Sequence, residues 1–185
     1  RADLQHHLTV VFLTRHSWGV APNVFMGHRT RALTQLVAEI LSRTPGRGAC
    51  AIVSESPPPR RCLLPHLQVG NVREVLASVG RRFYGYPDQR LRVTGVTGTN
   101  GKTTVTMLAQ YLLHAGGRSS GTAVLGTVHH DLGKRIIPST RTTPEAHDIC
   151  SMMATAVGAG CKRALIEVSS HGVCQKRVYG FNFET

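Results

Sequence analysis

The 185-residue chain is long enough to form one domain, or two small ones, around a hydrophobic core. Hydrophobic residues make up 41% of it, which argues against a disordered chain, and no apolar run approaches the roughly 18 residues that a membrane-spanning helix needs. The net charge of +12 is scattered along the chain and accompanied by only 5% aromatic residues, so the composition favours anionic small molecules over nucleic acid.

We therefore expect a cytoplasmic, monomeric protein without nucleic-acid or membrane partners. The opening residues (RADLQHH) lack the basic-then-apolar pattern of a signal peptide. The five cysteines are odd in number and widely spaced, with no C-x-x-C pair, which argues against both a disulfide framework and a zinc site. Buried thiols in a reducing compartment are the expectation.

Two helices and a short strand are predicted in the first half of the chain. Apolar residues at helical spacing predict an amphipathic helix over residues 30–42. Residues 49–53 (ACAIV) read as a short buried strand, and residues 71–83 as a second helix with Asn71 as its N-cap. The consecutive prolines of residues 56–61 (SPPPRR) exclude a helix or a central strand there.

The pattern changes after residues 85–89 (GYPDQ), which have the composition of a turn. From there the expected order is strand, loop, helix, strand, helix, strand. The expected strands are residues 91–97, 122–125 and 164–168, and the expected helices are residues 102–114 and 144–157. This alternation predicts an α/β fold with a parallel sheet covered on both faces. Residues 178–185 look like the beginning of a further turn or strand.

The first expected strand is followed by a glycine-containing loop that opens a helix, which is the context of a phosphate-binding loop. Its residues are Gly98, Thr99, Asn100, Gly101, Lys102, Thr103 and Thr104 (GTNGKTT). Lys102 supplies a mobile positive charge for phosphate oxygens, and the Thr103 hydroxyl can ligate Mg²⁺. Against the pattern G-x-x-x-x-G-K-[ST] one position differs, because Val96 stands in the first glycine position.

GTNGKTT resembles the ATP loop of the Mur ligase family, whose members also commonly lack that first glycine. Glu167 to Gly172 (EVSSHG), followed by Gln175 and Arg177, is similar to the signature of the branch that adds the third amino acid to UDP-N-acetylmuramoyl-L-Ala-D-Glu. Residues 142–144 (TTP) match a segment between the two motifs, and residues 126–127 (GT) match a smaller turn. The resemblance extends from about residue 49 to residue 185.

The resemblance implies an ATP-dependent amide ligase that uses ATP and Mg²⁺ and proceeds through an acyl phosphate. The third amino acid is left open between diaminopimelate and lysine. The resemblance also implies a small α/β domain over residues 1–88 that binds the UDP-muramoyl part. It implies that residues 89–185 form a central ATP-binding domain, like that of P-loop ATPases and incomplete at its C-terminus.

Glu167 is expected at the carboxyl end of a parallel strand, the edge where ligands of open α/β sheets collect, so its carboxylate can hold Mg²⁺ beside the loop. Lys102 and Glu167 are thus the expected catalytic residues, and Thr103 and Glu167 the expected metal ligands. The resemblance implies contacts with the muramoyl-dipeptide by Thr142, Thr143, Ser169, Gln175 and Arg177. His171 suits either a donor to this substrate or a structural role at a helix end.

The first 47 residues match the family poorly, and they predict no UDP-contacting residue. The family's Asp-His segment, its carbamylated lysine and its third domain also have no counterpart in the 185 residues, so we expect the chain to be inactive alone. Two alternatives stay open. One is another ligase of the superfamily, cyanophycin-synthetase-like or folylpolyglutamate-synthase-like, although folate-adding relatives usually carry Gly-Ser where this chain has Thr103-Thr104. The other is a non-catalytic nucleotide-binding module.

Overall fold

The computed structural model describes residues 52–55, 57, 66–115 and 121–184, and the chain divides into two compact units, residues 1–75 and 76–185. The helix expected over residues 30–42 lies outside the described residues. The predicted domain boundary between residues 88 and 89 stays a prediction.

In the first unit, β1 (Ile52–Ser54) and β2 (His66–Gln68) form a two-stranded parallel sheet. Helix α2 (Val72–Phe83) begins in this unit at the predicted cap, because the Asn71 Oδ1 accepts hydrogen bonds from the backbone N–H groups of Arg73 and Glu74, at 3.0 and 3.2 Å. These two bonds satisfy backbone donors that the first turn of a helix leaves without partners. The prediction of Asn71 as the N-cap is confirmed.

The second unit is built on a five-stranded sheet in the order β3-β7-β4-β5-β6. Strands β3 (Arg92–Val96), β7 (Arg163–Glu167) and β4 (Thr122–Leu125) run parallel to one another. Strands β5 (His129–Asp131) and β6 (Ile136–Pro138) continue the sheet in antiparallel pairing. The α/β fold class with a parallel sheet is confirmed, and two antiparallel strands that were not predicted extend this sheet at one edge.

The antiparallel part has a local cause in the turn between β5 and β6. Antiparallel strands can be joined by a few residues, whereas a parallel pair needs a long crossover. Here Gly133 adopts a left-handed φ of 88°, and its N–H donates to the Asp131 Oδ1 at 2.9 Å. A tight hairpin therefore forms where the sequence suggested only a connection.

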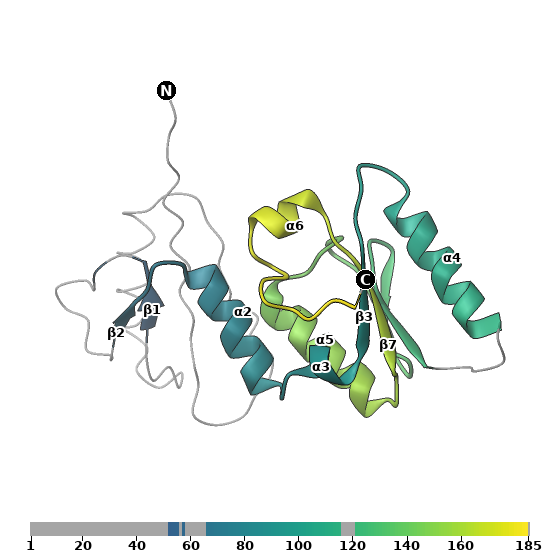
Figure 1. The fold of residues 1–185 in the computed structure, drawn as a ribbon, viewed down its shortest axis with the longest axis horizontal. Coiled ribbons are helices and arrows are strands. Elements are labelled where there is room, and N and C mark those ends of the chain that lie inside the picture. The colour runs from purple at the N-terminus through teal and green to yellow at the C-terminus, as the bar shows by residue number, and fades with distance from the viewer. Residues whose placement is uncertain (1–51, 56, 58–65, 116–120, 185) are drawn as a thin grey trace. The chain divides into compact units, whose positions relative to one another are not determined.

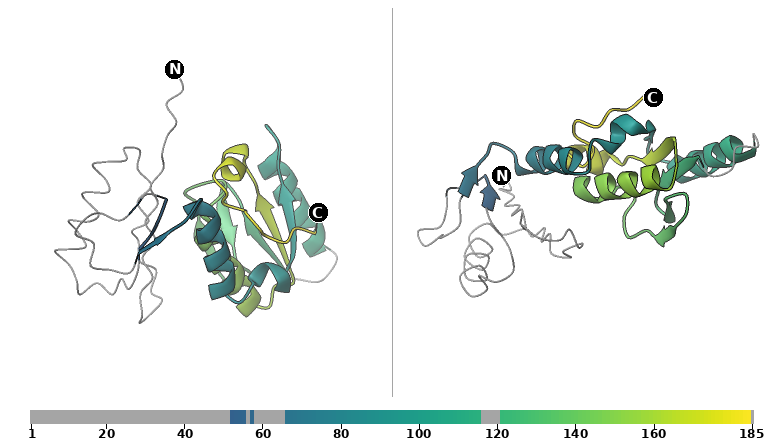
Figure 2. Two further views of the ribbon diagram at one scale, coloured as in Figure 1. Left: turned by 60° about the vertical axis from the view of Figure 1, so that its left-hand side comes forward. Right: turned by 90° about the horizontal axis from the view of Figure 1, so that it is seen from below.

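Helices α4 (Lys102–Ala115) and α5 (Ala146–Gly158) lie on opposite faces of this sheet, as Figures 1 and 2 show. Two short helices complete the unit, α3 (Pro87–Arg90) and α6 (Ser170–Cys174). The hydrophobic core lies on the α5 side, where side chains such as Leu125, Ile149, Met153 and Ile166 are fully buried. By contrast, α4 leaves large apolar side chains exposed, namely Val105, Met107, Leu108, Tyr111 and Leu112.

The end of the described chain runs along the free edge of β3. Residues 175–180 form turns, and the Glu184 N–H donates to the Val93 carbonyl at 2.8 Å. A second anchor is Asp88, which is fully buried, accepts a hydrogen bond from the Asn182 N–H at 3.0 Å and pairs with Arg81 at 2.8 Å. Of the turn or strand expected over residues 178–185, residues 178–180 form a turn, and residues 181–184 form neither a turn nor a strand.

The described cysteines differ in burial. Cys150 and Cys161 are buried free thiols, as expected, whereas Cys174 at the end of α6 is exposed. None of the helices within the described ranges is both long and apolar enough to cross a membrane.

Candidate active site

The phosphate-loop residues connect β3 to α4, at the carboxyl edge of the parallel strands. Gly98 and Gly101 adopt φ values of 146° and 79°, which side chains with a Cβ rarely tolerate. Lys102 is the first residue of α4, and its Nζ donates to the Gly98 carbonyl at 2.6 Å and lies 3.4 Å from the Thr99 carbonyl. The ammonium group therefore lies over the backbone of the same loop that would surround a phosphate.

The Glu167 carboxylate lies directly beside this loop, because Glu167 pairs with Val96 at the ends of β7 and β3. Its side chain is only 1% exposed. The Oε2 accepts hydrogen bonds from the hydroxyls of Thr103, at 2.9 Å, and Thr127, at 2.8 Å, while the Oε1 accepts one from the Thr127 N–H at 3.1 Å. Three donors from two loops thus surround one buried carboxylate.

A glycine makes room for this carboxylate. Gly126 follows β4, and a Cβ added to it would lie 2.5 Å from the Glu167 Oε1, closer than such atoms can approach. Any larger residue at this position would push the carboxylate away from Thr127. The turn formed by residues 126 and 127 therefore belongs to the site, whereas the sequence indicates this turn only by its resemblance to the family.

The site suits a metal held partly by the protein. Among the described residues there is no cluster of three or more His, Cys, Asp or Glu side chains that could enclose an ion. Mg²⁺ needs no such cluster, because it commonly binds one or two protein oxygens and completes its shell with water and phosphate. The Thr103 and Glu167 oxygens are 2.9 Å apart, and adjacent oxygens in an octahedral Mg²⁺ shell stand about 3 Å apart. These two residues therefore fit the ion.

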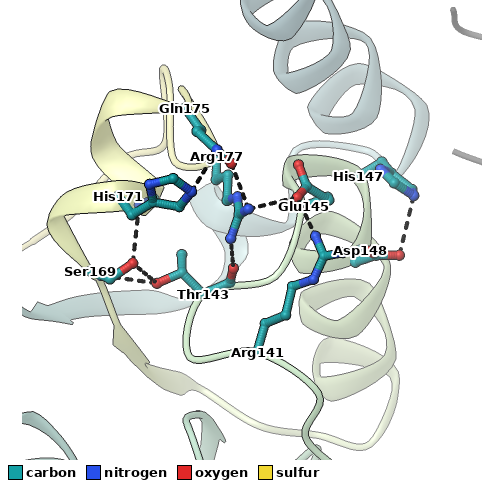
Figure 3. Close-up of polar contacts among 10 residues, drawn as sticks. Arg141, Thr143, Glu145, His147, Asp148, Ser169, His171, Gln175 and Arg177 are labelled. Carbon is teal, nitrogen blue, oxygen red and sulfur yellow. Dashed lines mark hydrogen bonds and ion pairs between the residues drawn. The ribbon is translucent and has the colours of Figure 1, made fainter. Parts of the chain in front are cut away.

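A second polar cluster surrounds Thr143, which is buried and lies in the loop that precedes α5 (Figure 3). The Thr143 hydroxyl donates to the Glu167 carbonyl at 2.8 Å and accepts from the Ser169 N–H at 2.9 Å. Ser169 is the N-cap of α6, where its hydroxyl accepts from the Gly172 N–H at 3.0 Å. Both hydroxyls therefore hold the start of α6 against the end of β7.

Arg177 lies in the same cluster and is almost fully buried, with 9% of its side chain exposed. Its guanidinium donates to the Thr143 carbonyl at 2.7 Å and to the Gln175 Oε1 at 2.5 Å, and it pairs with Glu145 at 3.0 Å. Arg141 contacts the same Glu145 oxygen at 2.7 Å from a half-exposed position. Figure 3 shows both guanidinium groups directed at this one carboxylate.

The two clusters meet at a threonine pair. The Thr127 and Thr142 hydroxyl oxygens are 3.1 Å apart, and because the one Thr127 hydroxyl proton is donated to Glu167, the Thr142 hydroxyl is the donor of this bond. The carboxylate side of the site is thereby joined to the segment that holds Thr143. Gln175 and His171 form a further exposed pair, with their side-chain nitrogens 2.6 Å apart. The structure thus brings Thr103, Glu167 and Thr142 together through Thr127, and brings Thr143, Ser169, Gln175 and Arg177 together around α6.

Three residues of this arrangement were absent from the sequence-based site, namely Thr127, Arg141 and Glu145. Thr127 could have been found, because a Gly-Thr pair directly after a buried strand lies at the same sheet edge as Glu167. No feature of the sequence marked Glu145 as part of the site, because an acidic residue beside a proline is common at the start of a helix.

Comparison with known proteins agrees with this geometry. Residues 96–185 match the family model of the Mur ligase middle domain. A UDP-N-acetylmuramoyl-L-alanyl-D-glutamate–2,6-diaminopimelate ligase of Solibacter usitatus is 42% identical over 139 residues, which cover 75% of this chain and 28% of that protein. A UDP-N-acetylmuramyl-tripeptide synthetase of a Roseiflexus species is 41% identical over 143 residues, covering 75% of this chain and 28% of its own length.

A solved structure of a UDP-N-acetylmuramoyl-L-alanyl-D-glutamate–2,6-diaminopimelate ligase shares the fold with a TM-score of 0.63 and 26% identity. The match covers 84% of this chain and 31% of that one. The chain therefore spans little more than a quarter of the length of these curated relatives.

Proposed function

We propose that this chain is part of an ATP-dependent Mur ligase of peptidoglycan precursor synthesis, because residues 96–185 match the family model of the Mur ligase middle domain. The ligase joins a diamino acid to UDP-N-acetylmuramoyl-L-Ala-D-Glu. Diaminopimelate is the favoured amino acid, since the names of several similar proteins specify it. The substrates are small molecules, and we propose that the protein acts as a cytoplasmic monomer.

The reaction has two steps. A carboxylate oxygen of the muramoyl-dipeptide attacks the γ-phosphorus of ATP, so that a new P–O bond forms, the bond to the β-phosphate oxygen breaks and ADP leaves. The amino group of the diamino acid then attacks the acyl carbon, the new C–N bond forms, and inorganic phosphate leaves as the nitrogen loses a proton. The first step depends mainly on positioning and on neutralising charge.

The residues of this chain divide that work. Residues 98–104 wrap the phosphates, with the Lys102 ammonium neutralising their charge. Thr103 and Glu167 supply oxygen ligands for Mg²⁺, which when bound withdraws charge from the phosphate oxygens. The muramoyl-dipeptide is oriented by residues of the second cluster, namely Thr142, Thr143, Ser169, Gln175 and Arg177.

One observation supports the proposal most directly. The buried Glu167 carboxylate lies at a single point where the phosphate-loop Thr103, the β4 turn and, through Thr127, the segment with Thr142 meet. A phosphoryl transfer needs its donor, its metal and its acceptor within such a small volume. Residues 103, 127, 142 and 167 are far apart in the sequence, and the fold brings them close enough to act on one ligand.

Nucleotide binding by a Lys102→Ala variant tests the proposal. Calorimetric titration with Mg-ATP should show affinity lowered by about tenfold or more, because a charge-assisted contact to phosphate is lost. The matched control is Lys134→Ala, which removes an exposed lysine from the β5–β6 turn at the opposite edge of the sheet and should leave the affinity unchanged. Equal affinity in all three proteins would contradict the assignment of the loop.

A further inference from the structure

We propose that Thr127 is a positioning residue that fixes the Glu167 carboxylate for the metal–nucleotide complex. This inference rests on the proposed function and adds a residue to it. The structure shows Thr127 as the residue with the most contacts to this carboxylate, since both its N–H and its hydroxyl donate to it, at 3.1 and 2.8 Å.

A glutamate carboxylate needs such donors to hold one orientation. The last torsion of a Glu side chain has a broad, roughly two-fold preference, so the side chain alone leaves the plane of its oxygens undetermined. Thr127 contacts both oxygens, with its N–H at Oε1 and its hydroxyl at Oε2. Two donors from one residue therefore fix the carboxylate plane, whereas Thr103 contacts Oε2 alone.

The contact with Thr103 shows which oxygen matters. The Thr103 and Thr127 hydroxyls both donate to the Oε2, at 2.9 and 2.8 Å. In the proposed function, Thr103 and Glu167 share the metal, so this oxygen must face the phosphate loop. The Thr127 hydroxyl holds it there before any ligand binds, which lowers the free-energy cost of ordering the site upon binding.

The backbone is shaped for this contact. Gly126 lets the Oε1 approach to a position that a Cβ would block at 2.5 Å, so the N–H of the next residue can reach it. Thr127 itself is exposed, and its hydroxyl oxygen also accepts a hydrogen bond from the Thr142 hydroxyl. If Thr127 only satisfied the buried carboxylate, it would not need to be exposed. Its exposed position lies between the Glu167 carboxylate and the segment with Thr142, where a ligand would bind in the proposed function.

The test compares Thr127→Val, which keeps the shape and the N–H but removes the hydroxyl, with Thr127→Ser, which restores the hydroxyl. The control is Thr155→Val, an exposed threonine on α5 whose hydroxyl bonds only within its own helix in the described structure. Binding of a non-hydrolysable ATP analogue is measured calorimetrically, with excess Mg²⁺ and again with EDTA. Thermal unfolding of each variant establishes that it is folded.

We expect Thr127→Val to lower the affinity for the Mg²⁺-loaded analogue by about tenfold and to leave the affinity in EDTA unchanged. Thr127→Ser and Thr155→Val should stay close to the unmodified chain. Gly126→Ala, which displaces the same carboxylate, should reproduce the Mg²⁺-selective loss. Equal losses with and without Mg²⁺, or none, in Thr127→Val would overturn the positioning role, whereas absence of binding by the unmodified chain would overturn the proposed function itself.

Discussion

His130 is a buried imidazole on β5, with 3% of its surface exposed and no hydrogen-bond partner for its Nδ1 among the residues that the structure describes. Burial lowers the pKa of His130, the neighbouring His129 lowers it further, and Asp148 opposes both effects. Since the pKa is lower in the folded chain than in the unfolded one, the stabilisation by neutral His130 is complete above the ordinary value of 6.5. It is lost as the pH falls through the folded-state pKa.

We therefore expect His130→Gln to flatten the dependence of stability on pH. Thermal unfolding of the unmodified chain, followed between about pH 7.5 and pH 5, should show a midpoint that falls as the solution is acidified. The variant should show a smaller fall, and the exposed His171→Gln should behave like the unmodified chain. Parallel pH profiles for all three proteins would show that protonation of His130 does not limit stability in acid.

The three described cysteines should differ strongly in reactivity. Burial, followed by the charge of Asp88, raises the pKa of the Cys150 thiol to about 12, and burial also raises that of Cys161. The thiolate is the reactive form, so both should resist alkylation in the folded chain, while the exposed Cys174 should react. Iodoacetamide labelling near pH 7.5, read by peptide mass spectrometry, checks this; labelling of Cys150 as fast as Cys174 would contradict it.

Single residues were predictable from the sequence where a chemical type coincided with a position on the sheet. Glu167 and Thr103 follow from a strand end and a phosphate loop, and the structure places them in direct contact. The partnership of Glu145 with Arg177 was not predictable, because the residues lie on different elements and each alone has an ordinary local explanation. A buried ion pair of this kind is visible only once the chain is folded.

Among the elements, the segment that follows α6 is attached to the loop before α5 through Arg177. Replacing this residue by Met should lower the free energy of unfolding by about 3 kcal/mol, because it removes a buried partner of Glu145 and the donor to the Thr143 carbonyl. Arg141→Met is the matched control. It removes the other partner of the same Glu145 oxygen, but from a side chain that is 51% exposed, so less than about 1 kcal/mol should be lost.

Urea denaturation of both variants measures the difference. Equal losses would show that the exposed and buried arginines contribute alike to the attachment of the segment that follows α6. The measurement also separates a structural role of Arg177 from the substrate contact proposed for it, since a variant that stays folded can be titrated with the muramoyl-dipeptide afterwards.

The sequence predicted elements with a strong local signal better than the three-residue strands. The pattern over residues 102–114 and 122–125 gave a helix and a strand with nearly the observed bounds, because buried strands and the helix after a phosphate loop have strong local signals. Strands β2, β5 and β6 have three residues each, too few to show a period of two. Their existence depends on neighbours that pair with them, so the mixed character of the sheet could not be predicted.

For the whole molecule, the length of the relatives sets the expectation for activity. The matched residues correspond to 28% of the Solibacter usitatus ligase. The proposed function assigns to them only the phosphate loop, two metal ligands and part of the substrate site. We expect the chain to bind nucleotide but to form no amide product. Incubation with Mg-ATP, UDP-N-acetylmuramoyl-L-Ala-D-Glu and either diaminopimelate or lysine, followed by mass spectrometry, should detect no tripeptide.

The full-length Solibacter usitatus protein is the positive control for that assay. Tripeptide formed by the 185-residue chain over multiple turnovers would mean that the remaining length of the family is dispensable for ligation. It would also require an amine-binding pocket among residues to which the proposal assigns no such role.

Asp88 has a consequence for the order in which the molecule assembles. Its pairing with Arg81 joins residues seven positions apart, and this contact can form as soon as α2 and α3 exist. Its bond to the Asn182 N–H spans 94 positions and closes a loop that contains the whole parallel sheet. Long loops close slowly, so we expect the segment with Asn182 to dock after α2 and α3 have formed. It then binds an Asp88 carboxylate that Arg81 has already oriented. During synthesis, residues 81 and 88 emerge well before residue 182, so their pairing can form before the segment around Asn182 is available to it.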